Sequence, residues 1–254
     1  MNDLTIGNPE YTFLIAGPCA IESTEQLELI LNSPNPPKIV RGGIFKMRTN
    51  KNSFQGLNET GIDIIKELKR RHDFHFVTEV SDPRQIEKVS SITSMFQVGA
   101  RSMYNYELLK ELELLKKPVI LKRAFSATVD EWLGAAEYLK GLGDQNIILC
   151  ERGIRSFDHK LRNMLDLGSV IYLKKNAPYP VIVDPSHAMG NSQYVIQASL
   201  AALAAGADGL IVEVHPNPEM AMSDGQQSLS LPLYRELVEK CSKLSLVLNK
   251  KLQV

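Results

Sequence analysis

Short apolar runs rich in Val and Ile alternate with amphipathic stretches along the whole 254-residue chain. Each run is only a few residues long and stops at Gly, Pro or a charged residue, which is typical of buried parallel strands. We expect six strands at residues 12–16, 38–41, 75–79, 95–98, 119–122 and 147–150, and two more in the segments 181–184 and 210–213, which end at Asp184 and Glu213.

Helical periodicity fills the intervals between these runs. Ser23 and Gln26 have the spacing of a capping box, Pro83 starts a short helix, and Thr128 caps another. Longer helices are expected at residues 58–71, 104–116, 193–206 and 232–248. Eight strand-then-helix units without a linker predict a single-domain (β/α)8 TIM barrel over residues 1–254, with residues 1–11 as a short extension. An open doubly wound sheet is the alternative, although GxGxxG and a P-loop are both missing.

Polar residues gather at the predicted strand ends. Catalytic side chains of (β/α)8 barrels lie at the carboxyl ends of the strands and in the loops that follow. These positions hold Arg41, Glu79, Arg101, Lys122, Arg152, Asp184, His187 and Glu213, while Cys19 lies three residues beyond the first strand. A His and a carboxylate that converge there can hold a metal or move a proton. The alternative is that each is an ordinary strand-end residue, satisfied by loop backbone.

The charge distribution narrows the class of ligand. The chain is neutral, with 29 basic and 29 acidic residues, which gives no sign of a nucleic-acid or membrane partner. Against this balance, the rim has a local excess of cations: Arg41, Lys46, Arg48, Arg101, Lys122, Arg123, Arg152 and Arg155. Arginine binds carboxylate and phosphate oxygens in a bidentate fork, so the rim suits a small phosphorylated substrate. The alternative is that these cations pair with acidic neighbours and face water.

Other features bound the setting of the protein. No apolar run approaches the roughly 20 residues that span a bilayer, and the N-terminus lacks the pattern of a secretory signal. The three cysteines, Cys19, Cys150 and Cys241, are too few and too scattered for a disulfide framework. We therefore expect a cytoplasmic protein.

A mixed set of metal-binding residue types comes from separate predicted loops: Cys19, His187, Glu213 and Asp224. Sulfur, nitrogen and oxygen ligands together suit divalent ions such as Mn, Fe, Co or Zn. The spacing is not that of CxxC or HxxxH. Taken singly, Cys19 reads as a buried structural thiol and Asp224 as a turn residue. The residues alone indicate an anion site in a barrel, with a metal as one option, and do not name the reaction.

Seven segments in chain order carry a family resemblance: AGPCAIES (16–23), RGGIFKMRT (41–49), SFQG (53–56), QVGARSM (97–103), ILCERGIR (148–155), VIVDPSHAMG (181–190) and ADGLIVEVHPNPEMAMSDGQQSL (207–229). They closely resemble the type I (beta subfamily) DAHP synthases, the subfamily related to the KDO8P synthases. The resemblance implies a (β/α)8 barrel that condenses phosphoenolpyruvate with erythrose 4-phosphate. The products would be phosphate and 3-deoxy-D-arabino-heptulosonate 7-phosphate (DAHP), the first intermediate of the shikimate pathway to chorismate and the aromatic amino acids.

The resemblance also implies roles for single residues. The divalent-metal ligands would be Cys19, His187, Glu213 and Asp224. Phosphoenolpyruvate would contact Arg41, Lys46, Ala100, Arg101, Lys122 and Arg152, and the aldose phosphate would contact Arg48, Thr49 and Asp184. Catalysis would involve Cys19 and His187 through the metal, Lys46 as proton donor to the aldehyde oxygen, and Glu79 as the group that positions or deprotonates water.

The loop after the second predicted strand separates the two related families. DAHP synthases carry Lys-Pro-Arg-Thr there, and KDO8P synthases, which use arabinose 5-phosphate, carry an Ala-Asn-Arg-Ser-type segment after their lysine. Residues 46–49 read Lys-Met-Arg-Thr, which favours DAHP synthesis. Met47 in place of proline should loosen this loop, because proline fixes φ. Ala124 also departs from the glycine that is usual after Lys-Arg.

Two further alternatives differ in class. Another barrel enzyme for phosphorylated sugars would need the cations but not the Cys, His, Glu and Asp set. A non-catalytic barrel that binds phosphorylated ligands would show a broken set of these residues, and here the set is intact.

The N-terminal region and the assembly state complete the expectations. Relatives often carry a ferredoxin-like regulatory domain or a fused chorismate mutase ahead of the barrel. Only about 11 residues precede the first predicted strand, so we expect no regulatory domain and no feedback inhibition through one. Family members are commonly tetrameric or dimeric, and we expect a homotetramer or homodimer.

Overall fold

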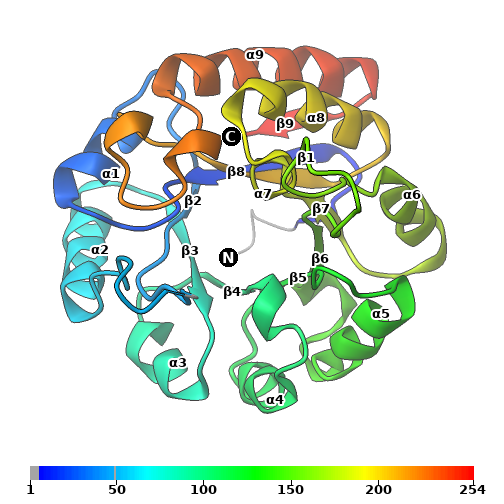
Figure 1. Ribbon diagram of the computed structural model, residues 1–254, viewed down its shortest axis with the longest axis horizontal. Coiled ribbons are helices and arrows are strands. Elements are labelled where there is room, and N and C mark those ends of the chain that lie inside the picture. Colours follow the sequence, from blue (N-terminus) through cyan, green and yellow to red (C-terminus); the bar gives the residue numbers. More distant parts are fainter. Residues whose placement is uncertain (1–5, 49) are drawn as a thin grey trace.

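In the computed structural model, which describes residues 6–48 and 50–254, eight parallel strands form a closed barrel inside a ring of helices (Figure 1). β1 closes the barrel because it pairs with β2 on one side and with β8 on the other. The predicted (β/α)8 architecture is therefore confirmed. The barrel strands are β1 Tyr11–Gly17, β2 Ile39–Arg41, β3 His75–Val80, β4 Met95–Val98, β5 Val119–Lys122, β6 Ile147–Glu151, β7 Val181–Val183 and β8 Gly209–Glu213.

The helices follow the strands in turn: α1 Thr24–Leu31, α2 Glu59–Arg71, α3 Pro83–Ser90, α4 Tyr106–Leu114, α5 Val129–Glu137, α6 Leu167–Asn176, α7 Pro185–Met189, α8 Ser192–Ala204 and α9 Leu231–Val247. The predicted caps are present. The Thr128 hydroxyl accepts the amide of Glu131, whose carboxylate accepts the amide of Thr128 in return. Ser23 also caps its helix, but the side chain of Gln26 accepts the amide of Glu22, so that capping box does not close on Ser23.

Three local features differ from the sequence prediction. α4 begins at Tyr106 instead of residue 104, because Asn105 caps it after a 3-10 turn at Ala100–Ser102. The short helix α7 was not predicted, although an Asp before a Pro is a good helix start. A ninth strand, β9 Lys251–Gln253, pairs in parallel with the first residues of β1.

Two layers of apolar side chains fill the molecule. One layer lies inside the barrel and includes Phe13, Ile15, Val77, Ile120 and Ile211. The other lies between the strands and the surrounding helices, because alternate strand residues point to opposite faces. The interior layer is a packed core rather than a channel, which leaves the carboxyl ends of the strands as the place for a ligand. No helix among residues 6–48 and 50–254 is long and apolar enough to cross a membrane.

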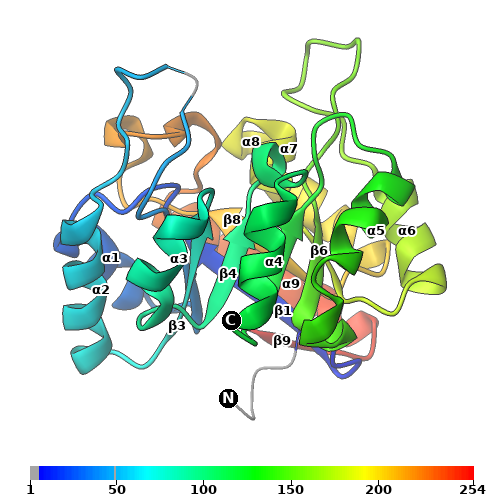
Figure 2. The same cartoon turned by 90° about the horizontal axis from the view of Figure 1, so that it is seen from below.

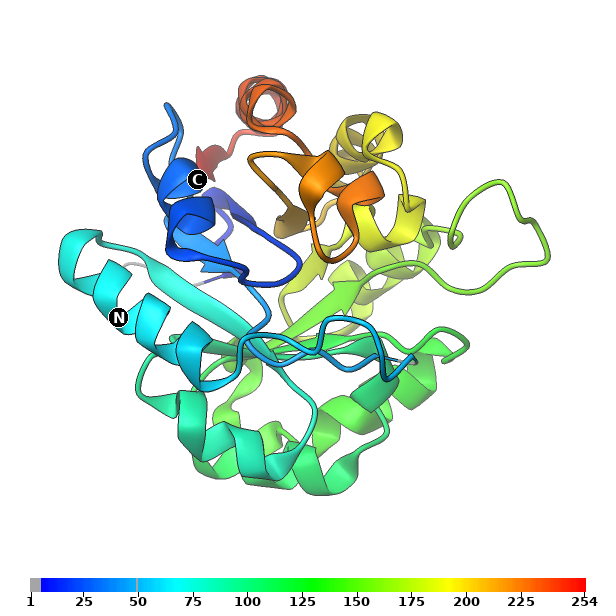
Figure 3. The same cartoon turned by 60° about the vertical axis from the view of Figure 1, so that its left-hand side comes forward.

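Two long loops rise above the carboxyl ends of the strands, after β2 and after β6 (Figure 2). The loop after β6 stands out from the barrel in light green in Figure 3. Its base is tied by an antiparallel bridge between Ile154 and Met164, whose backbone groups exchange two hydrogen bonds of 2.9 Å. These loops form the walls of the cavity described next.

Candidate active site and metal centre

A cavity of about 240 Å³ lies at the carboxyl ends of the barrel strands. Its walls are mostly polar and come from the end of β3, the end of β5 and the loops after β2, β4, β5, β6, β7 and β8. The predicted site residues that line it are Lys46, Arg48, Glu79, Ala100, Arg101, Lys122, Arg152, His187 and Asp224. Four others, Cys19, Arg41, Asp184 and Glu213, are buried and do not line the cavity. Thr49 lies outside the described residues.

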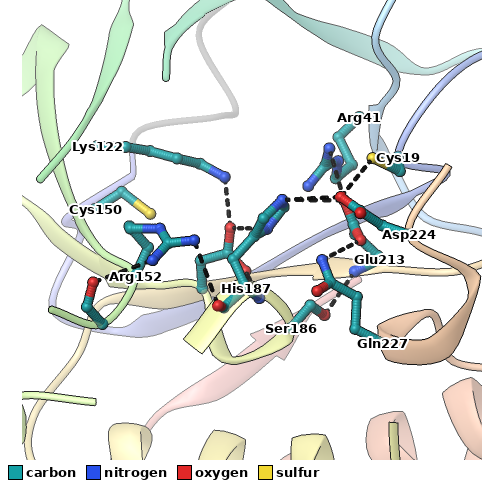
Figure 4. A network of polar contacts seen from close by, with 12 residues as sticks. Cys19, Arg41, Lys122, Cys150, Arg152, Ser186, His187, Glu213, Asp224 and Gln227 are labelled. Carbon is teal, nitrogen blue, oxygen red and sulfur yellow. Dashed lines mark hydrogen bonds and ion pairs between the residues drawn. The ribbon is translucent and has the colours of Figure 1, made fainter. Parts of the chain in front are cut away.

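The four predicted metal ligands converge at one side of this cavity (Figure 4). One ligand atom from each of Cys19, His187, Glu213 and Asp224 lies within 4.8 Å of the others. The Cys19 Sγ to Asp224 Oδ2 distance is 3.3 Å, and His187 Nε2 lies 3.4 Å from Glu213 Oε1 and 3.8 Å from Asp224 Oδ2. A tetrahedral ion with bonds of about 2.0–2.3 Å separates its ligands by roughly 3.3–3.8 Å. The spacing therefore fits a divalent ion.

An unpartnered buried atom supports the same fit. Glu213 Oε1 accepts no hydrogen bond within the described part of the chain, although its other oxygen accepts the Gln227 amide at 2.6 Å. A buried carboxylate oxygen without a donor is costly unless a cation approaches it. Glu213 Oε1 faces His187 Nε2 and Arg41 Nη2, the latter at 3.3 Å. This oxygen is thus available as a metal ligand.

The protonation states of the group also suit a cation. Burial lowers the pKa of His187, which leaves a neutral imidazole at neutral pH. Burial alone would raise the pKa of Glu213, but His187 and Arg41 outweigh it and hold that pKa below its ordinary value. Burial raises the pKa of the Cys19 thiol to about 12. A bound ion would therefore have to displace the Cys19 proton.

Asp184 does not line the cavity but contacts two residues that do, His187 and Lys122. It is fully buried and caps α7 by accepting the amide of His187 at 2.9 Å. Its Oδ2 lies 2.8 Å from His187 Nδ1 and 2.5 Å from Lys122 Nζ. The carboxylate fixes the imidazole so that Nε2 faces the other ligands. The expected contact between Asp184 and the aldose phosphate stays a prediction.

Lys46 lies between the metal-binding group and the cationic wall. Its Nζ donates to the Cys19 carbonyl at 3.0 Å and lies 3.1 Å from Cys19 Sγ. Burial lowers the pKa of Lys46, but Cys19 and Glu79 outweigh it and the pKa is raised. The ammonium is therefore protonated and points into the cavity region, as a proton donor requires.

Two buried guanidinium groups near the cavity keep N–H donors that no acidic residue of the described chain occupies, although Arg41 Nη2 lies 3.3 Å from Glu213. Arg152 is buried, and among the residues that the structure describes its Nη1 and Nη2 donate only to the carbonyls of Gly153 and His187. Buried Arg41 has Nε and Nη1 without a hydrogen-bond partner among the described residues. Buried cationic donors without acceptors indicate that an anion binds here.

Arg123 does not belong to this wall, contrary to the prediction that all eight cations share the rim. Its Nη1 pairs with Glu151 at 3.0 Å and with Asp166 at 2.9 Å. The guanidinium also lies 5.9 Å from the centre of the Trp132 ring, on the helix side of β5. The error arises because successive side chains of a strand point to opposite faces, and Lys122 and Arg123 are neighbours in sequence.

Several residues of the site were not predicted from sequence. Ser223 Oγ accepts a hydrogen bond from Arg48 at 2.7 Å and lies 3.2 Å from Cys19 Sγ. Gln227 bridges Glu213 to Arg162, whose Nη1 donates to Gln227 Oε1 at 2.5 Å. Asp224 adopts a left-handed backbone with φ of 52°, which Asp tolerates better than most residues. Only the segment SDGQQS, already noted for Asp224, offered a signal for these positions.

Comparison with known proteins identifies the family. The profile of the DAHP synthetase I family matches residues 1–248. The chain belongs to the DAHP synthetase I family. A phospho-2-dehydro-3-deoxyheptonate aldolase of Thermotoga maritima is 44% identical over 247 residues, which cover 96% of this chain and 73% of that protein. A 2-dehydro-3-deoxyphosphooctonate aldolase of Legionella pneumophila is 28% identical over 248 residues, 89% of each chain.

Solved structures agree with the sequence comparison. The crystal structure of the Thermotoga maritima DAHP synthase superimposes with a TM-score of 0.94 at 43% identity, covering 99% of this chain and 74% of that one. A truncated form of the Thermotoga maritima enzyme superimposes with a TM-score of 0.89 at 40% identity. The match covers 99% of this chain and 93% of that one. Membership of the DAHP synthetase I family makes this barrel an enzyme of carbon–carbon bond formation.

Gly99→Ala is expected to lower kcat by roughly tenfold to a hundredfold, because small displacements of catalytic groups cost about this much. A Cβ on Gly99 would lie 2.3 Å from Glu79 Oε1, so the carboxylate must leave its place beside Gln97. Steady-state kinetics on purified variants measures the effect. Gly134→Ala is the matched control, since nothing lies within 4 Å of the added Cβ and kcat should not change. Wild-type kcat in Gly99→Ala would show that the position of Glu79 does not matter.

Proposed function

We propose that this protein condenses phosphoenolpyruvate with erythrose 4-phosphate to form DAHP and phosphate, the first step of the shikimate pathway. The observation that carries this proposal is the position of Lys46. Its ammonium touches Cys19 of the metal-binding group and lines the same cavity as Arg101, Lys122 and Arg152. A reaction between an anionic nucleophile and a carbonyl requires such a shared wall between an anion site and a carbonyl-activating site.

The proposed metal is a divalent ion such as Mn, Fe, Co or Zn, held by Cys19, His187, Glu213 and Asp224. When bound, it supplies a Lewis acid that polarises the aldehyde carbonyl or orients water. The protein's part is to hold these four groups in place, with Asp184 on His187 and Gln227 on Glu213. Such outer contacts orient ligands and raise their basicity.

The remaining residues bind, orient and transfer protons. Arg101, Lys122 and Arg152 bind the anionic groups of phosphoenolpyruvate, together with Arg41 and the backbone at Ala100. C3 of phosphoenolpyruvate attacks the aldehyde carbon while water adds at C2, and the C2–O bond then breaks to release phosphate. Lys46 donates a proton to the aldehyde oxygen as the new bond forms. Glu79, half-buried in the cavity wall, positions or deprotonates the water.

The aldose phosphate is proposed to bind along the loop after β2. Arg48 lines the cavity and its guanidinium is fixed by Ser223. Met47 also lines the cavity, with 38% of its surface exposed, where DAHP synthases resembling this chain carry proline. Thr49 is part of the proposal from the family motif alone. Asp184 is also proposed as a contact of the aldose phosphate from the family motif, and its carboxylate pairs with His187 and Lys122.

The choice of aldose is the first direct test. We expect kcat/KM with erythrose 4-phosphate to exceed that with arabinose 5-phosphate by roughly 10- to 200-fold, the range that one added group in a fitted site produces. Loss of phosphoenolpyruvate absorbance measures both reactions. Equal or reversed preference would support KDO8P synthesis instead. If phosphoenolpyruvate is not consumed with either sugar, both synthase activities are rejected and the non-catalytic barrel is favoured.

The cellular setting is proposed on narrower grounds. Cys19, Cys150 and Cys241 are all free and buried, which suits the reducing cytoplasm. Assembly as a homotetramer or homodimer stays a prediction, supported by an apolar groove between α8 and α9 that Leu200, Leu244 and Val247 line.

A further inference from the structure

Three arginine side chains gather around the ring of Phe125, which follows β5. The guanidinium carbons lie 4.7 Å, 5.1 Å and 5.5 Å from the ring centre for Arg152, Arg155 and Arg101. Arg101 follows β4, whereas Arg152 and Arg155 follow β6. The Arg155 amide also donates to the Phe125 carbonyl at 2.7 Å, which ties the two loops together. The ring is thus the common contact of three cations from the two neighbouring loops.

These arginines lack the acidic partners that a nearby arginine has. Within residues 6–48 and 50–254, no ion pair within 4.0 Å involves Arg101, Arg152 or Arg155, whereas Arg123 pairs with two carboxylates. A carboxylate would neutralise a guanidinium and occupy its donors. An aromatic face attracts the cation through its quadrupole and leaves both the positive charge and the N–H groups available. The ring is therefore suited to hold cations that must bind something else.

The cavity shows where that anion would bind. Phe125, Arg101 and Arg152 all line the candidate active site, and Lys122 stands in the same wall. Lys122 is already paired with Asp184, whereas Arg101 and Arg152 line the cavity with no ion pair among the described residues. Burial lowers the pKa of Arg152, which reflects how little water surrounds it. Arg101 and Arg155 are exposed and Arg155 does not line the cavity, so contact with the Phe125 ring is what keeps their charges beside that of Arg152.

The geometry points to Phe125 as a positioning residue that holds Arg101, Arg152 and Arg155 together as a three-arginine clamp for a substrate phosphate. This inference rests on the proposed function and deepens it, because it gives the anion site a support and adds Arg155 as a member. Phe125 itself transfers no proton and makes no covalent bond. Its effect is on how tightly the phosphorylated substrate binds, with little effect on the chemical step.

Phe125→Leu is expected to raise the KM for phosphoenolpyruvate roughly tenfold while kcat stays within about threefold, because the lost attraction acts on binding. The dissociation constant for phosphoenolpyruvate without aldose, measured by calorimetry on the metal-loaded enzyme, should rise by a similar factor. The dissociation constant for inorganic phosphate alone should rise too. Phe125→Tyr keeps the aromatic face and is expected to restore all three values to within about threefold of wild type.

Control variants separate this role from a structural one. Phe74→Leu removes another ring that lies under a cation, Lys69 at 6.0 Å, but Phe74 is remote from the cavity and the KM should not change. Thermal unfolding checks that each variant is folded, and Phe125→Met replaces Phe125→Leu if that variant is not. If Phe125→Leu and Phe125→Tyr lose the same affinity for phosphoenolpyruvate, then the shape of the side chain matters and its aromatic face does not. That result would overturn the inference.

The outcomes for the two proposals are distinct. If wild type binds phosphoenolpyruvate and Phe125→Leu binds it equally well, the clamp is wrong while the proposed function stands. If wild type binds no phosphoenolpyruvate, the proposed function fails, and the phosphate titration still decides the clamp. A selective loss of phosphate affinity in Phe125→Leu, restored in Phe125→Tyr, would support it in that case.

Discussion

Replacing Cys19 with alanine is expected to lower kcat by roughly 10³-fold, the effect of losing several kcal/mol of charge stabilisation at the carbonyl. Cys19 offers the sulfur of the proposed four-ligand set and lies 3.3 Å from Asp224 Oδ2. Its removal leaves two carboxylates and an imidazole that bind a divalent ion less tightly. Steady-state kinetics before and after treatment with a chelator measures the loss.

A second readout of the same variant does not depend on activity. Because burial raises the pKa of Cys19 to about 12, the thiol is protonated at neutral pH, and the ion must displace that proton. Calorimetry of ion binding in buffers of different ionisation enthalpy should show about one proton released by wild type and none by Cys19→Ala.

Cys241→Ala is the matched control for these measurements. This thiol is also buried, and burial raises its pKa to about 12, but it belongs to α9 and is no member of the metal-binding group. The control should keep its activity, its ion affinity and its proton release. Full activity of wild type after thorough chelation would contradict the metal role.

Lys46→Ala is expected to lower kcat by roughly 10²- to 10⁴-fold, the usual contribution of a positioned proton donor. The KM for phosphoenolpyruvate should rise as well, since the ammonium lines the anion cavity. Lys46 is half-buried and its Nζ is held at 3.0 Å from the Cys19 carbonyl, so an unbound water molecule is a poor substitute for this positioned donor. Kinetics with saturating substrates separates the effect on kcat from the effect on binding.

Lys46→Arg tests whether charge alone is enough. It keeps the positive charge but spreads it over a guanidinium that hardly deprotonates, so kcat should stay low even if substrate binding recovers. Lys51→Ala, which removes an exposed lysine from the same loop, is the matched control and should behave as wild type. Near-normal kcat in Lys46→Ala would reject Lys46 as the proton donor.

Much of the fold could be predicted from local pattern. Strand positions were right to within about one residue, because each strand is apolar on both faces and bounded by Gly, Pro or charge. The helix starts predicted at Thr128 and Pro83 are confirmed, because a helix cap depends on residues only three or four positions apart. β9 was missed, since Lys251–Gln253 is a strand only by pairing with Tyr11–Phe13 far away in sequence.

The site was predictable where strand ends define it. His187 follows β7 and Glu213 is the last residue of the adjacent strand β8, so the topology brings them together with little freedom. Arg123 was misplaced because a charge count along the chain does not say which face of a strand a residue occupies. Phe125 escaped notice as part of the site, because an aromatic residue in a loop gives no sign of which cations will surround it.

The sequence by itself determined the barrel, the family motifs and the residue types available for a metal and an anion, since these depend on short-range periodicity and on strand ends. Only the tertiary structure decided which cations remain without acidic partners. It also decided that the Asp184 carboxylate pairs with His187 and Lys122, and that three arginines lie around the Phe125 ring. Those outcomes depend on contacts between distant loops, where burial and side-chain direction fix whether a charge is neutralised or left for a ligand.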